Sequence, residues 1–212
     1  MKKIIILMCI LLLAPSTIFA KSTENKGSTK VQLDLLNVEL PYPREEINIV
    51  YENDLRHVTA KIYDKSTNEL LEEYTETKEV KEIGFYRANS DYVYRTLVGV
   101  KRYGPTSVRV VARVKVYVWG TTGTFVQISE VQDKYSLPGD SGRYSLEGDR
   151  VYLNSSLPSR SIELNAVGNI VIESVKSSGF DVELLESVGF SVTKSENWFA
   201  RKFYNFNITL GV

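Results

Sequence analysis

A run of alternating side chains from Ser107 to Val131 constrains the fold more than any other part of the sequence. In its first half, small apolar side chains recur at every second position, and the places between them hold mostly basic and aromatic residues. The apolar set is Val108, Val110, Ala112, Val114, Val116 and Val118. Successive side chains of a strand point to opposite faces, so this pattern predicts a long β-strand with one fully apolar face.

The same run predicts a hairpin and its register. Gly120-Thr121-Thr122-Gly123 interrupts the alternation, which then resumes. A two-residue loop would pair Val116 with a glutamine, whereas a loop of three or five residues pairs it with Ile128. The longer loop also places Val118 opposite Val126. Since a slip of one residue would turn every side chain to the other face, we expect the odd-numbered loop.

The first twenty residues have the layout of a cleavable export signal. Lys2 and Lys3 precede an apolar run from Ile4 to Leu13, and a short exit segment ends in the small residue Ala20. This layout predicts cleavage after Ala20. The apolar run is too short to span a bilayer as a stable helix. We therefore expect a secreted or extracellular protein, free or associated with the cell wall of a Gram-positive-type bacterium, with no transmembrane anchor after cleavage.

Removal of residues 1–20 leaves 192 of the 212 residues and no cysteine, because Cys9 lies within the signal. No disulfide can then form, so stability must come from a packed core, which a chain of this length can bury. Without Lys2 and Lys3, the 26 basic residues become 24 and face 26 acidic ones, a formal charge of −2. This balance argues against nucleic-acid binding driven by bulk charge.

Turn-forming residues divide the rest of the chain into short alternating segments, with little helix. This spacing predicts an all-β fold, an antiparallel β-sandwich or open barrel of about ten strands with at most one or two short helices. Residues 21–30 are expected to form a flexible tail and residues 31–212 a single domain, with a possible sub-boundary near Gly104-Pro105. Residues 76–83 and 180–187 fit either a helix or a strand.

Several local predictions can be checked against a structure. Residues 31–40 are expected to form one strand, and residues 57–63 to pair with 70–75 as a second hairpin. A turn is expected at Asn89-Ser90-Asp91. Residues 162–164 and 170–175 are expected to form a hairpin across Val167-Gly168-Asn169. The chain should end in a long strand whose buried face comprises Trp198, Ala200, Tyr204, Phe206, Ile208 and Leu210, interrupted by Lys202.

Gly139-Asp140-Ser141-Gly142 resembles the motif around the nucleophile of chymotrypsin-like serine proteases, which are also exported all-β proteins. In that family, backbone N–H groups beside the serine form the oxyanion hole. The resemblance implies a hydrolase with Ser141 as nucleophile and His57, the only histidine, as base. Arg143 stands where the family has a further glycine, and Pro, Gly, Asp and Ser all favour turns, so we expect a surface turn without catalytic residues.

Acidic residues gather in the longest predicted irregular region, from Asp133 to Asp149. Asp133, Asp140, Glu147 and Asp149 offer the hard oxygen ligands that bind Ca²⁺ outside the cell. They lack the close Asp-x-Asp-x-Asp spacing of a compact loop, so we expect solvated turn residues and neither a metal nor another cofactor. The many carboxylates leave a glycosidase pair open, since the sequence does not give their separation in space.

Aromatic and basic residues supply the candidates for a binding surface. Trp119, at the hairpin end, can form a platform for a sugar or a partner protein together with Trp198 and the many tyrosines. Aromatic residues in strands more often pack within the protein. Arg109, Arg113 and Lys115 line the second face of the central strand. There they can contact an anionic wall polymer or phospholipid, and a solvated sheet face is the simpler expectation.

We therefore expect an exported, non-enzymatic binding or structural protein of the bacterial cell envelope or extracellular space, with a cell-wall polymer or a surface protein as its partner. Two alternatives stay open. One is a secreted serine hydrolase that uses Ser141 and His57. The other is a membrane-active protein of the pore-forming type, which inserts the long hairpin with its apolar face toward lipid.

Overall fold

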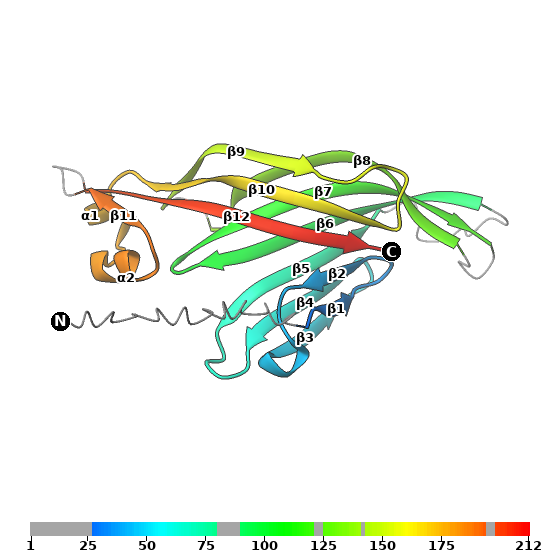
Figure 1. The fold of residues 1–212 in the computed structure, drawn as a ribbon, viewed down its shortest axis with the longest axis horizontal. Coiled ribbons are helices and arrows are strands. Elements are labelled where there is room, and N and C mark those ends of the chain that lie inside the picture. The colour runs from blue at the N-terminus through cyan, green and yellow to red at the C-terminus, as the bar shows by residue number, and fades with distance from the viewer. Residues whose placement is uncertain (1–26, 80–89, 121–124, 141–142, 194–197) are drawn as a thin grey trace, which may run out of the picture.

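The alternating segments of the sequence form two open antiparallel sheets of six strands each, packed face to face as a β-sandwich (Figure 1). The computed structural model describes residues 27–79, 90–120, 125–140, 143–193 and 198–212. The export-signal prediction for residues 1–20 lies outside these ranges. The sandwich confirms the expected fold class, and the sheets do not close into a barrel.

One sheet is a meander in which every strand pairs with its neighbours in the sequence, and we call it the meander sheet. Its strands are β3 Ile47–Asn53, β4 His57–Asp64, β5 Leu70–Lys78, β6 Ser90–Tyr103, β7 Thr106–Trp119 and β8 Phe125–Pro138. The predicted hairpin of residues 57–63 with 70–75 is confirmed as β4 and β5. Gly104-Pro105 is the turn between β6 and β7, which pair along their whole length.

The other sheet contains the first and last strands, and we call it the terminal sheet. Its order is β1 Thr29–Gln32, β2 Asn37–Leu40, β12 Phe199–Gly211, β10 Ser161–Ile172 and β9 Ser145–Leu153, with β11 Ser191–Thr193 also on β12. The described residues also form the short helices η1 Arg44–Glu46, α1 Val175–Ser178 and α2 Val182–Ser187. Helices α1 and α2 lie at one end of the long axis (Figure 1).

The central hairpin has the predicted register. Val116 lies opposite Ile128 and Val118 opposite Val126, and the pair Trp119–Phe125 leaves five residues between the strands. The alternating apolar face is buried from Val108 to Val116, as expected. It packs in one core with the inner faces of β10 and β12. The predicted face of the last strand is buried as well, at Ala200, Tyr204, Phe206, Ile208 and Leu210. The prediction is wrong for Trp198, which precedes β12 and is only partly buried.

Residues 31–40 form two strands, so the single strand predicted there is wrong. β1 and β2 are a hairpin, and its turn closes with a 2.9 Å hydrogen bond from Leu33 N–H to the carbonyl of Leu36. The turn contains no Gly or Pro, and its backbone is held instead by the carboxylate of Glu76 in β5. β1 also begins at Thr29, two residues before the expected start of the folded part.

The predicted hairpin across Val167-Gly168-Asn169 is wrong, because β10 continues through these residues as one strand. Gly168 sits at a β-bulge in the pairing of β10 with β9. A Cβ atom there would lie 2.9 Å from the ring of Tyr204 and 3.0 Å from Cα of Asp149. The glycine therefore marks a close approach of neighbouring strands, which is a second common use of this residue in sheets.

Two further boundaries differ from expectation. The predicted irregular region from Asp133 to Asp149 is mostly strand, since β8 extends to Pro138 and β9 begins at Ser145. The predicted turn at residues 89–91 is wrong at Ser90, where β6 begins, while Asn89 lies outside the described ranges.

The two ambiguous segments are settled where the structure describes them. Residues 182–187 are helical, and the Asp181 side chain caps this helix by accepting a 2.8 Å hydrogen bond from Leu184 N–H. Residues 76–78 belong to strand β5.

Candidate functional site

The four predicted binding residues of β7 share the face of the meander sheet that points away from the core. Arg109, Arg113, Lys115 and Trp119 alternate with the buried valines, so the pleat turns them outward. Trp119 is 52% exposed to solvent. The structure thus brings these residues to one surface, although they are spread along the strand.

Aromatic side chains of the neighbouring strands join Trp119 at the hairpin end. The register places Tyr92 of β6 opposite Tyr117 and Phe125 of β8 opposite Trp119. The ring centroids of Tyr92 and Tyr117 are 5.3 Å apart, and those of Tyr117 and Phe125 are 6.4 Å apart. Such tilted pairs of rings are favourable, so these side chains support one another on the sheet surface.

Three cations lie over aromatic rings in the same region. Lys115 Nζ is 4.2 Å from the ring centroid of Tyr92, and the guanidinium carbon of Arg113 is 5.1 Å from that of Tyr94. The guanidinium carbon of Arg160 is 5.1 Å from the ring centroid of Phe125. Cation–π contacts of this kind stabilise a positive charge on a surface without a counter-ion.

Arg160 reaches this surface from the loop that follows β9. The adjacent Ser159 forms an isolated bridge with Ile128 of β8, with N–H to carbonyl distances of 2.7 and 3.0 Å. This bridge holds the loop along the edge of the meander sheet. We call the whole surface the aromatic–cationic patch, and its members are Tyr92, Tyr94, Arg113, Lys115, Tyr117, Trp119, Phe125 and Arg160.

The charges of the patch are only partly balanced. Arg113 Nε donates a 2.8 Å hydrogen bond to the carboxylate of Glu79. Exposed Glu130 lies opposite Lys115 in the register, yet no carboxylate of the described residues comes within 4.0 Å of Lys115 or Arg160. The patch therefore carries two positive groups that aromatic rings hold in place and that no acidic side chain of the described residues neutralises.

Sequence analysis did not single out five members of the patch: Tyr92, Tyr94, Tyr117, Phe125 and Arg160. The position of the tyrosines could have been predicted from the Gly104-Pro105 turn, because a two-residue turn there places Tyr92 opposite Tyr117. The predicted hairpin register likewise implied Phe125 beside Trp119. Nothing local indicated Arg160, since its place depends on a bridge between segments far apart in the sequence.

Arg109 lies outside the patch, toward the other end of β7. Its Nη2 donates a 3.2 Å hydrogen bond to the carbonyl of Gly139, while its Nε is buried and lacks a hydrogen-bond partner among the described residues. Nearby, the buried Tyr144 hydroxyl donates to the Ser107 carbonyl at 2.7 Å and accepts from the N–H of Asp140 at 3.1 Å. These bonds shape the connection between β8 and β9.

His57, one of the two candidate catalytic residues, lies far from the described segment that precedes the other, Ser141. His57 begins β4, and its Nδ1 lies 3.0 Å from the Asp54 carboxylate. Ser141 lies outside the described residues, but Asp140 before it accepts a 3.0 Å hydrogen bond from Ser107 Oγ. His57 is level with Arg113 in the ladder. It is therefore separated from Ser107 by about 14 Å across three strand spacings and about 20 Å along β7.

The candidate calcium ligands lie on separate elements and do not share one loop. Asp133 is exposed on β8, and Asp149 of β9 accepts a 3.1 Å hydrogen bond from Ser136 Oγ. Glu147 is paired with Arg201 on β12. Within the described ranges, no group of three or more His, Cys, Asp or Glu side chains is close enough to hold a metal ion.

Trp198 lies apart from the patch. Its carbonyl accepts a 2.8 Å hydrogen bond from the N–H of Val175, the first residue of α1, at the opposite end of the molecule (Figure 1). The residue has a positive φ of 43°, in the left-handed region. The two tryptophans therefore do not form a common platform.

β5 also places buried carboxylates in the core, a feature that sequence analysis missed. Glu72, 2% exposed, accepts hydrogen bonds from the hydroxyls of Tyr42 at 2.9 Å and Tyr74 at 2.7 Å, and Lys101 Nζ lies 2.8 Å away. Burial raises the pKa of the Tyr74 hydroxyl well above 10.0, and the charge of Glu72 raises it further. Burial likewise raises the pKa of the Glu76 carboxyl. Glu72, Tyr74 and Glu76 are closed to solvent, so they form no accessible site.

In the parts of the chain that the structure describes, no helix combines the length and apolar character needed to cross a bilayer. Comparison with known proteins found no matching family model, no similar curated protein and no similar solved structure.

Proposed function

We propose that this protein is a non-enzymatic binding protein of the bacterial cell envelope or extracellular space, and that it binds through the aromatic–cationic patch. Lys115 carries the argument, because its ammonium group sits on the ring of Tyr92 without a carboxylate partner within the described ranges. Such an arrangement offers a ligand a positive charge and an apolar surface at the same place. The signal-like residues 1–20 support export.

A non-enzymatic role is supported by the surroundings of the possible catalytic groups. The only histidine of the chain, His57, contacts Asp54. About 14 Å across the strands and about 20 Å along β7 place it about 24 Å from Ser107, which bonds to Asp140 just before Ser141. On β9, Asp149 is engaged by Ser136 and Glu147 by Arg201, while Glu130 and Asp133 of β8 are exposed on the surface.

Retention on isolated envelopes tests this proposal. The processed chain, residues 21–212, is incubated with envelopes of the producing bacterium, sedimented and quantified beside the double variant Tyr92→Ala/Trp119→Ala. A matched control, Tyr152→Ala/Phe203→Ala, removes two aromatic residues that are 45% and 63% exposed on the terminal sheet. We expect the patch variant to lose at least ten-fold in retention, by analogy with aromatic anchors of other interfaces, and the control to match wild type.

Equal retention of the patch variant and wild type would refute the role of the patch. Absence of any retention, together with the full amount of processed chain in the culture medium, would refute envelope binding.

A further inference from the structure

We infer that the aromatic–cationic patch docks on a bilayer surface that contains anionic phospholipid. This inference rests on the proposed function, because it names the ligand of the same patch. The ligand chemistry follows from the side chains of the patch, their charge and their place in the molecule.

The last rungs of the hairpin are apolar on both faces. Trp119 and Phe125 pair on the outer face, and the partly buried Val118 and Val126 pair on the inner face. Tyr92 of the neighbouring strand is 54% exposed. Tryptophan and tyrosine combine an apolar ring with a polar group, and they are the residues enriched where membrane proteins meet the lipid headgroups.

Positive charge lies directly beside these rings. Lys115 is two residues from Tyr117 on the same face of β7, and Arg160 lies over Phe125. Neither cation has a carboxylate within 4.0 Å in the described parts of the chain. Each Lys or Arg near an anionic leaflet raises the membrane partition coefficient about five-fold. Charge complementarity therefore favours an anionic lipid surface.

A sugar polymer fits this surface less well. Sugars stack on the open faces of aromatic rings, but Lys115 covers a face of Tyr92 and Arg160 covers a face of Phe125. The patch therefore offers cations to a ligand where a glycan site would offer bare rings. This geometry favours the phosphate groups of lipids, with the exposed aromatic edges entering the headgroup region.

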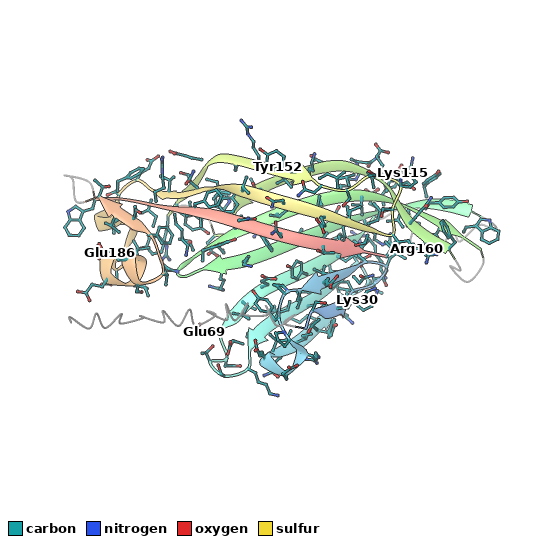
Figure 2. The ribbon with its side chains drawn as sticks, viewed as in Figure 1. Lys30, Glu69, Lys115, Tyr152, Arg160 and Glu186 are labelled. Atoms are coloured by element: carbon teal, nitrogen blue, oxygen red, sulfur yellow. The ribbon has the colours of Figure 1, made fainter. Side chains whose placement is uncertain are left out.

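The patch also lies where end-on docking is possible. Lys115 and Arg160 are at the same end of the long axis, whereas Glu186 of α2 is at the opposite end (Figure 2). A bilayer that contacts the end with Lys115 and Arg160 would therefore meet these cations and the neighbouring rings without contact to helices α1 and α2 (Figures 1 and 2).

Co-sedimentation with vesicles tests the inference. The processed chain is mixed with vesicles of phosphatidylcholine alone and of phosphatidylcholine with phosphatidylglycerol, at low and high salt. We expect binding to the anionic vesicles only, weakened by salt. The variant Lys115→Gln/Arg160→Gln should lower the partition coefficient roughly 25-fold, because each of the two lost cations contributes about five-fold. Arg150→Gln, which removes an exposed cation of β9 on the terminal sheet, should leave it unchanged.

Tryptophan fluorescence reports which end enters the headgroup region. The chain has two tryptophans, so Trp198→Phe leaves Trp119 as the only reporter and Trp119→Phe leaves Trp198. We expect a blue shift with anionic vesicles for the first variant and none for the second. A shift from Trp198 alone, no binding to anionic vesicles, or wild-type partition of the Lys115/Arg160 variant would each overturn the inference.

Lipid-free cell walls separate this inference from the proposed function. If walls retain the wild-type chain, the patch variants abolish that retention and vesicles bind nothing, then envelope binding through the patch stands and lipid docking fails. If neither walls nor vesicles nor whole envelopes retain the chain, both proposals fail.

Discussion

Glu76 Oε2 accepts a 2.9 Å hydrogen bond from the backbone N–H of Leu36, and both residues are fully buried. The same oxygen accepts the N–H groups of Asp34 and Leu35, and Oε1 lies 3.0 Å from Nε of Arg95. Glu76 belongs to the meander sheet, whereas residues 34–36 connect two strands of the terminal sheet. One carboxylate therefore satisfies three backbone donors of this turn and fastens the two sheets together.

Substitution of Glu76 by glutamine should destabilise the protein strongly. The amide keeps the shape but removes the charge, so Arg95, 4% exposed, loses the 3.0 Å ion pair with Glu76, while Asp34 stays 3.8 Å away. Breaking a buried ion pair from one side costs about 3–5 kcal/mol in the free energy of unfolding. Urea unfolding measures this loss, and exposed Glu45→Gln is the control, with an expected change within about 0.5 kcal/mol. Equal midpoints for the two variants would contradict the fastening role.

The strands of the central hairpin were predictable because their alternation is uninterrupted. The strand segment from Val108 to Val116 has one fully apolar face, and any register that turned this face outward would expose all its apolar side chains to water. The last strand was predictable for the same reason. Lys202, the exception on its buried face, bonds to the Val188 carbonyl and lies 5.6 Å from the ring centroids of both Tyr103 and Phe190, so its amine leaves the core.

The failures of sequence analysis have tertiary causes. The turn at residues 33–36 was missed because its donors are satisfied by a glutamate 40 positions away. Gly168 indicated a turn although it actually makes room for Tyr204 of the neighbouring strand. In the patch, Arg113, Lys115 and Trp119 followed from alternation alone, whereas Arg160 depends on a bridge to Ile128. Local patterns give the face of a residue but not its partners from other segments.

Gly168→Ala should destabilise the sandwich, contrary to the usual gain from replacing a glycine with a more restricted residue. The added methyl group would lie 2.9 Å from a ring carbon of Tyr204, whose hydroxyl bonds to Ser136 Oγ at 3.2 Å. Overpacking of this kind costs about 1–3 kcal/mol. Thermal unfolding compares this variant with Gly27→Ala, where a Cβ atom would meet nothing within 4 Å. A melting temperature at or above that of wild type would show that the bulge tolerates a side chain.

The two faces of β7 should differ sharply in their tolerance of charge. Val116→Lys places an ammonium group at a fully buried position, where an unpaired charge costs several kcal/mol or shifts its pKa, so we expect loss of the folded state. Val111→Lys makes the same change on the outer face, opposite Val98 and Tyr135, and should cost about 1 kcal/mol or less. Circular dichroism and urea unfolding distinguish the two. Similar stability of both variants would be inconsistent with the assigned faces.

Asp54 should make stability depend on pH in the acid range. Its Oδ1 accepts the backbone N–H groups of Arg56 and His57 at 2.7 Å each, and its carboxylate also contacts His57 Nδ1. The bond from Arg56 N–H is the largest cause that lowers the pKa of Asp54 from 3.8 to about 2. Because the folded pKa is the lower one, the unfolded chain binds more protons between these values. The stabilisation is therefore complete above pH 3.8 and is lost as the pH falls through about 2.

Asp54→Asn removes this titration while the side-chain oxygen can still accept the two backbone bonds. The advantage of wild type over the variant should shrink as the pH falls from 3.8 toward 2, and it should be constant above that window. Urea unfolding of both proteins across the window gives the difference directly. Asp64, whose pKa is lowered chiefly by the hydrogen bond from the Ser66 hydroxyl, is present in both proteins and cancels. Parallel stability curves for wild type and variant would show that the Asp54 carboxylate has the same pKa in the folded and unfolded chain.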